Sequence, residues 1–329
     1  MTPFKAYLIQ QEEGKVVSRF VELNEAQLDP GEVTIRVAYS SVNYKDALAA
    51  TGAGKIIRRF PCVGGIDLSG TVVASADARF AKGDAVIATS FDIGVAHHGG
   101  YAEYARIPAA WVVPLPKGLS LYEAMAIGTA GFTAALGIVR LEDNGLKPAS
   151  GAVAVTGASG GVGSIAVDIL ANLGYQVTAI TGKDAEHDYL RSLGASAIIS
   201  RHTLDMGKRP MEKALWAGAY DTVGGEPLAW LTRTVDQGGS IAACGLTAGI
   251  ELHTTVMPFI LRGINLLGVD SGYCPMPLRQ KVWQRLAADM RPPHLALMTR
   301  TIPFDQLPQV FDDFLQTRVR GRIVVDLAA

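Results

Sequence analysis

A glycine-rich segment near the middle of the chain has residue types suited to phosphate binding. Residues 156–163 read Thr-Gly-Ala-Ser-Gly-Gly-Val-Gly. They follow the apolar run at 152–156 and precede the helical pattern at 164–173. Glycine permits a tight turn and a close approach of the backbone to a pyrophosphate, and the free N–H groups at a helix start can then hold the phosphates. We therefore expect a dinucleotide to contact the end of this segment, at Ser159, Gly160, Gly161, Val162 and Gly163.

The same segment also fits the Gly-x-Ser-x-Gly pattern of the nucleophile elbow in α/β-hydrolases, which would make Ser159 a nucleophile. That chemistry needs an acid and then a histidine further along the chain, and residues of both types follow Ser159. None of them lies in a recognisable signature, and the hydrolase interpretation gives no role to Gly163. Dinucleotide binding is therefore favoured, with a glycine-rich turn that binds nothing as the structural alternative.

The residues at the end of the next apolar run select between NAD and NADP. In an NAD site, an acidic residue about 20 positions past the glycines binds the ribose 2′-hydroxyl. Here Thr181, Gly182 and Lys183 occupy that place, and Arg201 follows the next run. A hydroxyl and two cations suit a 2′-phosphate, so we predict NADPH as the cofactor, although either cation could be an ordinary surface charge. Asp184 is assigned to the start of a helix, where an acid is favourable.

These residues need a parallel sheet to position them. Apolar runs at 152–156, 176–181 and 197–200 alternate with helical patterns at 164–173 and 186–193, and a glycine follows each helical pattern. Further strands are expected at 220–223, 240–244 and 266–269. This alternation predicts a doubly wound parallel sheet.

The first part of the chain has a different pattern. Short strands separated by turns are expected at 33–39, 69–74, 84–88 and 101–105, which is typical of a β-barrel-like domain. A helix is expected over 121–139, interrupted around 128–131, and the strand at 321–326 is expected to return to the first domain. The predicted domains are 1–123 (first part of a catalytic domain), 124–295 (nucleotide-binding domain) and 296–329 (return to the catalytic domain).

Composition limits the class of protein. The chain has 329 residues, with 30 Lys and Arg against 31 Asp and Glu, so its net charge of −1 gives no reason to expect nucleic acid or an anionic membrane as a partner. The content of 49% hydrophobic residues excludes a disordered chain. No uninterrupted apolar run approaches the ~18 residues of a membrane span. The three cysteines are far apart, which disfavours disulfides and a cysteine zinc site. We expect a cytoplasmic protein.

Several motifs together resemble the medium-chain dehydrogenase/reductase family over essentially the whole chain. They lie at 43–46, 65–70, 128–134, 156–163 and 321–322. Residues 52–61, 255–262 and 268–271 are similar to the zinc-free group of quinone oxidoreductases and acryloyl-CoA reductases. The resemblance implies an α/β fold in which a Rossmann doubly wound parallel sheet is inserted into a GroES-like β-barrel catalytic domain. It also implies a homodimer, for which strand 264–269 could extend the sheet across a two-fold axis.

The resemblance further implies that no catalytic metal is bound. Zinc-dependent relatives have a cysteine where Asn43 stands, a histidine where Ile66 stands, and a third ligand near residues 127–128. Without a Lewis acid, alcohol oxidation lacks its usual means of stabilising an alkoxide. We therefore expect NADPH-dependent reduction of the C=C bond of a short 2-enoyl-CoA, acryloyl-CoA to propionyl-CoA. The alternatives are an NADPH quinone or enone oxidoreductase and a non-catalytic NADPH-binding regulatory protein.

The expected catalytic residues are carried over from the same resemblance. Tyr44 would donate a hydrogen bond to an enolate oxygen, and Asn43 would position the nicotinamide or the substrate. Asp46, Asp67 and Arg322 would form a polar frame around them. As alternatives, Tyr44 is only a packed aromatic ring, Asp46 caps a helix, and Asp67 merely holds Arg322. Additional cofactor contacts are expected from the following residues: Tyr44, Thr133, Leu246, Ser271 and Arg322.

Two further groups of residues have competing interpretations. Lys55, Arg58 and Arg59 form a basic cluster that could bind CoA phosphates or could simply be a solvated face. His97 and His98 suggest a metal site, but adjacent histidines in a glycine-rich loop are more typical of loop structure or of substrate contacts.

Overall fold

The structure, a computed structural model, describes residues 2–327, and its chain divides into two compact units. The first unit comprises Met1–Thr129, Gly272–Lys281 and Leu295–Ala329. The second comprises Ala130–Ser271 and Val282–His294. Residues 272–281, which the predicted boundaries assign to the nucleotide-binding domain, belong to the first unit in this division. There, Arg279 donates hydrogen bonds to the backbone and side chain of Thr89.

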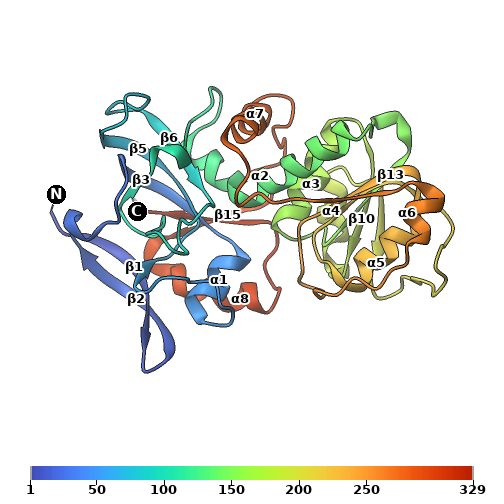
Figure 1. Cartoon of the computed structure of the whole chain (residues 1–329), viewed down its shortest axis with the longest axis horizontal. Helices are drawn as coiled ribbons and strands as arrows, with labels where there is room; N and C mark the ends of the chain where they lie inside the picture. The colour runs from blue at the N-terminus through green and yellow to red at the C-terminus, as the bar shows by residue number, and fades with distance from the viewer. Residues whose placement is uncertain (1, 328–329) are drawn as a thin grey trace. The chain divides into compact units, whose positions relative to one another are not determined.

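The first unit is built mainly from antiparallel strands (Figure 1). A three-stranded sheet has the order β2-β1-β4, and a seven-stranded sheet has the order β15-β16-β3-β5-β6-β8, with β7 also paired to β3. The strands are β1 Phe4–Glu12, β2 Lys15–Leu23, β3 Val33–Val42, β4 Cys62–Val63, β5 Asp67–Ser75, β6 Ala85–Thr89, β7 Tyr104–Ile107, β8 Val112–Pro114, β15 Thr299–Pro303 and β16 Arg322–Asp326. The predicted strand at 101–105 begins later, at Tyr104, which pairs with β3; the Tyr101 carbonyl instead accepts from the Tyr7 N–H of β1 at 2.8 Å.

The final strand returns to the first unit as predicted. β16 pairs antiparallel with β3, placing Ile323 opposite Val42, and parallel with β15. This return brings Arg322 next to the end of β3, where Asn43 begins the helix α1 (Tyr44–Thr51). The helix α8 (Phe311–Leu315) belongs to the same unit, and α7 spans Met276–Leu286.

The helix α2 (Leu121–Asp143) contains the predicted interruption. Gly128 has φ 51° and ψ −160° inside it, which is not a helical conformation. Among the residues that the structure describes, α2 is the one helix long and apolar enough to cross a membrane, and 89% of its most apolar 18-residue window is buried within the protein. A helix in a protein core meets the same criterion of length and composition, so this finding gives little support to a membrane span.

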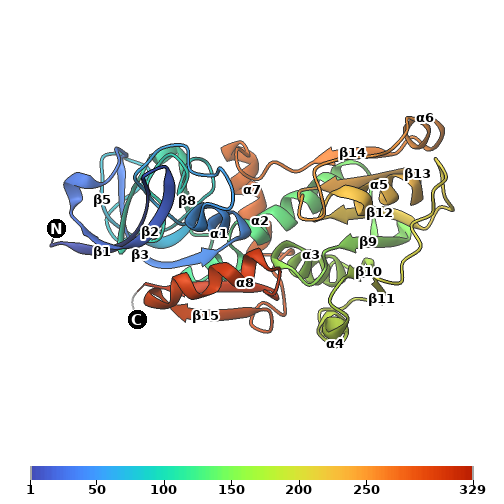
Figure 2. The same ribbon diagram turned by 90° about the horizontal axis from the view of Figure 1, so that it is seen from below.

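The second unit is a six-stranded parallel sheet with the order β11-β10-β9-β12-β13-β14. Its strands are β9 Ala152–Thr156, β10 Gln176–Thr181, β11 Ala197–Ser200, β12 Trp216–Asp221, β13 Val235–Ala243 and β14 Asn265–Gly268. Its helices are α3 Gly161–Asn172, α4 His187–Ser192, α5 Gly225–Thr234 and α6 Met257–Arg262. Figure 2 shows α3 alongside β9 and β10, with β11 and β14 at opposite edges of the sheet. The predicted doubly wound sheet is confirmed.

Strand order reverses between β9 and β12, which are direct neighbours in the sheet. In open α/β sheets, ligands bind beyond the carboxyl ends of the strands at such a switch point. The glycine-rich segment follows β9 directly. The fold therefore places the segment predicted to bind phosphate where a dinucleotide is expected.

Candidate functional site

The glycine-rich segment forms a tight turn between β9 and α3. Gly157 has φ 58°, a conformation that favours glycine, and a Cβ atom at Gly163 would lie 2.2 Å from the Gly157 carbonyl oxygen. Gly161 and Gly163, which we expected before the helix, form its first turn, because Gly160 is the N-cap residue. The first N–H groups of a helix have no acceptor within it, so this turn offers donors for a phosphate.

A cavity opens at the carboxyl ends of β9, β10 and β12 in the second unit. Its lining includes Thr156, Gly157, Gly182, Arg201, Pro227 and Trp230. A Cβ atom at Gly182 would lie 3.1 Å from the Arg201 guanidinium, so these two predicted residues are in contact. One wall of the cavity is thus cationic, and another is apolar and aromatic. That combination suits a phosphorylated ribose attached to a planar base.

Lys183 adds a second positive charge after β10. Its backbone N–H donates to Thr181 Oγ1 at 3.0 Å. Burial lowers the pKa of Lys183, and Glu186 partly opposes that shift. A phosphate beside the amine would favour its charged form, so Lys183 and Arg201 fit a 2′-phosphate. Sequence reasoning missed His202, whose Nε2 lies 2.9 Å from the Gly182 carbonyl oxygen; its place directly after Arg201 was the available signal.

The remaining predicted cofactor residues of the second unit lie in three places. Ser159 Oγ is 3.1 Å from Thr181 Oγ1, which joins the glycine turn to the end of β10. Thr133 Oγ1 donates to Ser271 Oγ at 2.7 Å, so these two residues are also brought together. Leu246 is 58% exposed on the segment that follows β13.

In the first unit, Asp67 is the centre of a buried polar network. Its carboxylate accepts hydrogen bonds from Ser41 Oγ at 2.6 Å and from Asn43 Nδ2 at 2.9 Å. Thr129 donates to the same carboxylate through its backbone N–H at 2.9 Å and through Oγ1 at 2.5 Å. Four donors on one buried carboxylate are strong evidence that Asp67 is a structural hub of this site.

Asp46 is the second carboxylate of the network, and it caps α1. Its Oδ2 accepts from the backbone N–H of Asn43 at 2.9 Å and from Asn43 Nδ2 at 3.1 Å, and its Oδ1 accepts from Ile66 N–H at 3.0 Å. Asp46 therefore helps to cap α1 from the third position of the helix, whereas the N-cap residue is Asn43 and not Asp46. Burial, followed by the nearby charge of Asp67, raises the pKa of Asp46 to about 7.

Arg322 completes the network from the last strand. Its guanidinium donates to Asn43 Oδ1 at 3.2 Å, to Ser41 Oγ at 2.9 Å and to the carbonyl of Ala126 at 3.0 Å. Burial lowers the pKa of Arg322, and Asp67 and Asp46 oppose that shift. Both hydrogens of the Asn43 amide are thereby engaged by carboxylates while its oxygen accepts from Arg322.

Sequence reasoning missed several members of this network. Ser41 links Asp67 to Arg322, Thr129 donates twice to Asp67, and Tyr101 donates through its hydroxyl to the Ser41 carbonyl at 3.1 Å. Thr129 lies in the motif at 128–134, which was the available signal. Tyr44 begins α1 with a half-buried side chain, and the structure shows no hydrogen bond for it among residues 2–327.

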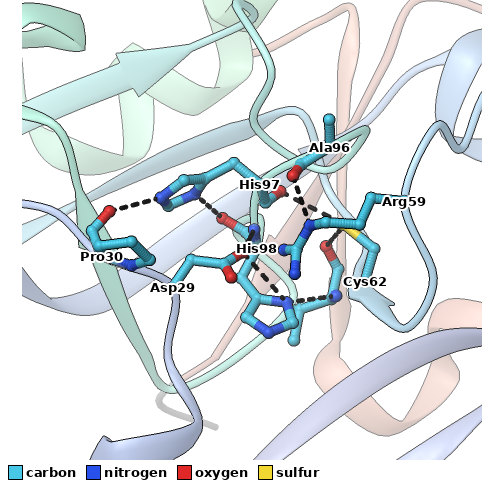
Figure 3. Close-up of polar contacts among 8 residues, drawn as sticks. Asp29, Pro30, Arg59, Cys62, Ala96, His97 and His98 are labelled. Carbon is cyan, nitrogen blue, oxygen red and sulfur yellow. Dashed lines mark hydrogen bonds and ion pairs between the residues drawn. The ribbon is translucent and has the colours of Figure 1, made fainter.

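The two neighbouring histidines are tied into the loops around them (Figure 3). His97 places Nδ1 3.0 Å from the His98 carbonyl oxygen and Nε2 3.0 Å from the Pro30 carbonyl oxygen. His98 accepts from Val63 N–H at its Nδ1, and its own N–H donates to Asp29. In the part of the chain that the structure describes, no group of three His, Cys, Asp or Glu side chains could hold a metal ion.

The basic cluster is engaged at the surface. Arg58 pairs with Asp92 and donates to the Tyr273 hydroxyl at 2.8 Å. Arg59 pairs with Asp29 and donates to the Ala96 carbonyl at 2.8 Å. Both arginines therefore already have anionic partners, which favours the interpretation as a surface cluster over CoA binding.

Comparison with known proteins agrees with this architecture. Residues 29–117 match the alcohol dehydrogenase GroES-like domain, and residues 161–288 match the zinc-binding dehydrogenase domain. The putative quinone oxidoreductase YhfP of Bacillus subtilis is 49% identical over 99% of both chains. The acrylyl-CoA reductase AcuI of Ruegeria pomeroyi is 47% identical over 99% of this chain and 100% of that protein.

Solved structures extend the comparison. The YhdH oxidoreductase of Salmonella enterica, in complex with NADP, has a TM-score of 0.96 and 49% identity, covering 98% of this chain and 99% of that one. YhfP of Bacillus subtilis with NAD bound has a TM-score of 0.97, covering 99% and 100% of the two chains.

The parallel sheet with its glycine turn, the antiparallel unit with its buried polar network and the named relatives together identify a two-unit α/β oxidoreductase. At this level of identity the assignment is more specific. The chain belongs to the medium-chain dehydrogenase/reductase family, in its zinc-free group.

Proposed function

We propose that this protein is a cytoplasmic, zinc-independent reductase that uses NADPH to reduce the C=C bond of a short 2-enoyl-CoA, acryloyl-CoA to propionyl-CoA. The observation that carries the proposal is the buried polar network around Asn43, the residue that by resemblance stands where zinc-dependent relatives have a cysteine. Its amide is held by Asp46 and Asp67 on one side and Arg322 on the other. The 47% identity to an acrylyl-CoA reductase over the whole chain supports the substrate class.

The second unit would hold the cofactor. Ser159 and Gly160–Gly163 would receive the pyrophosphate, and Thr181, Gly182, Lys183 and Arg201 the 2′-phosphate. Thr133, Leu246, Ser271, Tyr44 and Arg322 are the further proposed contacts. Bound NADPH supplies a hydride. The presence of Gly182 and Arg201 in the lining of the cavity described above supports the proposed place of the 2′-phosphate.

The first unit would orient the substrate. Reduction of a conjugated thioester places negative charge on the carbonyl oxygen and leaves Cα to be protonated. Tyr44 is the proposed hydrogen-bond donor to that oxygen, because it begins α1 with a half-buried side chain next to Asn43. Asn43, Asp46, Asp67 and Arg322 would fix the start of α1 and so the position of Tyr44. They orient groups, and none of them transfers hydride.

A quinone is the second candidate substrate. The chain is 49% identical to a putative quinone oxidoreductase, and this similarity supports the second candidate. The match to that protein and the match to the acrylyl-CoA reductase each cover 99% of this chain. The same cofactor site would serve both reactions, because only the acceptor differs.

Oxidation of NADPH, followed by absorbance, tests these possibilities. Acryloyl-CoA, crotonyl-CoA and a benzoquinone would be compared, with NADH as the matched cofactor and a chelator present throughout. Rapid turnover of acryloyl-CoA with NADPH, unaffected by the chelator, is the expected result. Turnover with the benzoquinone and with neither acyl-CoA would favour quinone reduction as the function. NADPH binding without turnover of any substrate would favour a regulatory NADPH-binding protein.

We also propose that the protein is a homodimer formed at the β14 edge of the parallel sheet. β14 is the last strand of that sheet, so its outer edge can pair with a second copy. The neighbouring helix α6 and the segment before it expose large apolar side chains: Ile250, Val256, Ile260 and Leu261. Several exposed large apolar side chains on one segment of the chain are typical of a protein interface.

A further inference from the structure

We infer that Ser90 is a positioning residue for the proposed active site, and that Phe91 and Arg279 hold it in a strained turn. The inference rests on the proposed function, because it gives Asp67 and Asn43 their role. Ser90, Phe91 and Arg279 were not among the predicted site residues. They come from the segment after β6 and from the helix α7.

The backbone at Ser90 and Phe91 is the first observation. Both residues have positive φ, 65° and 51°, in the left-handed region that side chains disfavour. Positive φ also occurs at Glu13, in the hairpin turn between β1 and β2, and at Thr317, directly after α8. Ser90 and Phe91 are consecutive and lie at neither a hairpin nor a helix end. Strain of this kind persists only where surrounding structure imposes it, and it clusters at functional sites.

The surrounding contacts impose this turn. The backbone N–H of Ser90 donates to the Ile66 carbonyl at 2.7 Å, and that of Phe91 donates to the Gly272 carbonyl at 3.0 Å. The Phe91 ring stacks on Trp111, with centroids 5.5 Å apart and planes 8° apart. The guanidinium of Arg279, which is fully buried, lies 4.4 Å from the Phe91 ring centroid. This geometry is that of a cation–π interaction in a desolvated setting.

Arg279 also fixes the two ends of the turn. It donates to the Thr89 carbonyl at 3.2 Å and to Thr89 Oγ1 at 3.0 Å. It donates to the Gly272 carbonyl at 3.1 Å, the same oxygen that accepts from Phe91 N–H. The buried side chain of Arg279 therefore contacts Thr89, the ring of Phe91 and the carbonyl of Gly272.

The result of this turn is a hydrogen bond from Ser90 into the polar network. Ser90 Oγ lies 3.0 Å from Thr129 Oγ1. Thr129 gives its hydroxyl hydrogen to Asp67 Oδ1 at 2.5 Å, so in the bond with Ser90 it accepts and Ser90 donates. Asp67 in turn accepts from Asn43 Nδ2. The chain of hydrogen bonds runs from Ser90 through Thr129 to Asp67, which orients the amide of Asn43.

Two variants and one control test this assignment. Ser90→Ala removes the hydroxyl, and Phe91→Leu removes the ring that Arg279 and Trp111 hold. Thr317→Gly changes another positive-φ residue, in the same unit but outside the network. Loss of one positioned hydrogen bond is expected to lower kcat for Ser90→Ala by about tenfold, with the KM for NADPH unchanged. Phe91→Leu is expected to lower kcat similarly, and Thr317→Gly to leave it unchanged.

An NMR measurement of the Asn43 side-chain amide, which needs no substrate turnover, tests the hydrogen-bond chain independently of the proposed function. The chain has five asparagines, so selective ¹⁵N-asparagine labelling gives five pairs of side-chain NH2 signals, and Asn43→Ser assigns the Asn43 signal, which is one such pair. We expect that signal to shift in Ser90→Ala and Phe91→Leu and to stay in place in Thr317→Gly. An unshifted Asn43 signal in both variants would overturn the inference. A wild type inactive on enoyl-CoAs and quinones, with the Asn43 signal shifted as expected, would refute the proposed function and leave the hydrogen-bond chain supported.

Discussion

At the scale of single residues, two cations are the proposed recognition elements for the 2′-phosphate of the cofactor. Arg201 packs against Gly182, a residue without a side chain, so its guanidinium faces the cavity at the end of β10. Lys183 lies directly after that glycine and has a pKa lowered by burial. An acidic residue in this place would select NAD. Discrimination between NADP and NAD is thus expected to come from these side chains.

Substitution of Arg201 tests that recognition. Arg201→Ala is expected to raise the KM for NADPH by about 10- to 100-fold, because a hydrogen bond to a charged group contributes roughly 1.5–3 kcal/mol. The KM for NADH should change little. Arg191→Ala, which alters an exposed arginine on α4, is the control for a simple change in surface charge. An equal increase of KM for both cofactors would contradict the assignment of Arg201 to the 2′-phosphate.

The buried carboxyl group of Asp46 should make the stability of the protein depend on pH. Its folded-state pKa of about 7 lies above the ordinary value of 3.8, so between these values the folded protein binds more protons than the unfolded one. The free energy of unfolding should therefore fall as pH rises through this window, by at most about 1.4 kcal/mol per pH unit for one proton. Asp46→Asn removes the titration. The free energies of unfolding of wild type and Asp46→Asn would be measured with denaturant from pH 5 to 8. The wild type should lose stability relative to Asp46→Asn as pH rises to about 7, and above that pH the difference should stay constant. A pH-independent difference would show that Asp46 does not titrate there.

At the scale of elements, the turn from β9 to α3 depends on glycine for space as well as for conformation. A Cβ atom at Gly163 would lie 2.2 Å from the Gly157 carbonyl oxygen, whereas one at Gly160 would come no closer than 3.3 Å to it. Gly163→Ala must therefore displace the start of α3 from the end of β9.

We expect Gly163→Ala to lower the free energy of unfolding by about 1–3 kcal/mol, the usual cost of overpacking, and to weaken NADPH binding. Gly160→Ala should lower stability less, because its Cβ has more room. Thermal unfolding and titration of NADPH fluorescence measure the two effects. If both variants were equally stable, the close approach at Gly163 would not be what requires glycine there.

At the scale of the whole molecule, the proposed dimer can be tested through its apolar surface. Ile260 is 71% exposed on α6, next in the chain to the edge strand β14. Light scattering at micromolar concentration should give about twice the chain mass of 34.8 kDa for the wild type. Ile260→Glu should shift the protein toward the monomer, because a charge would be buried in the interface. Leu297→Glu, at an exposed leucine in the first unit, is the control. A monomeric wild type would refute the dimer.

Local patterns in the sequence were enough to predict the parallel sheet and its glycine turn. Strand and helix periodicities act over a few residues, so 152–156, 176–181 and 197–200 were each assigned as observed. The glycines before α3 and the cations after β10 are short-range signals of the same kind. The hairpin β1–β2 and the strand β15 were not predicted.

The site in the first unit was only partly predictable. Asn43, Asp46, Asp67 and Arg322 were named through a family resemblance, but Ser41, Thr129 and Ser90 were not. Serine and threonine are common and have no periodic signal, so only their partners reveal their role.

The sequence by itself determined the fold class, the glycine turn after β9 and the positive charges after β10 and β11, because each depends on residues close together in the chain. Only the tertiary structure decided how the polar network is connected. Arg322 meets Asn43 across 279 positions of the chain, and Thr129 meets Asp67 across 62. Hydrogen bonds need atoms about 3 Å apart, and for residues so distant in sequence the folded backbone alone sets that distance.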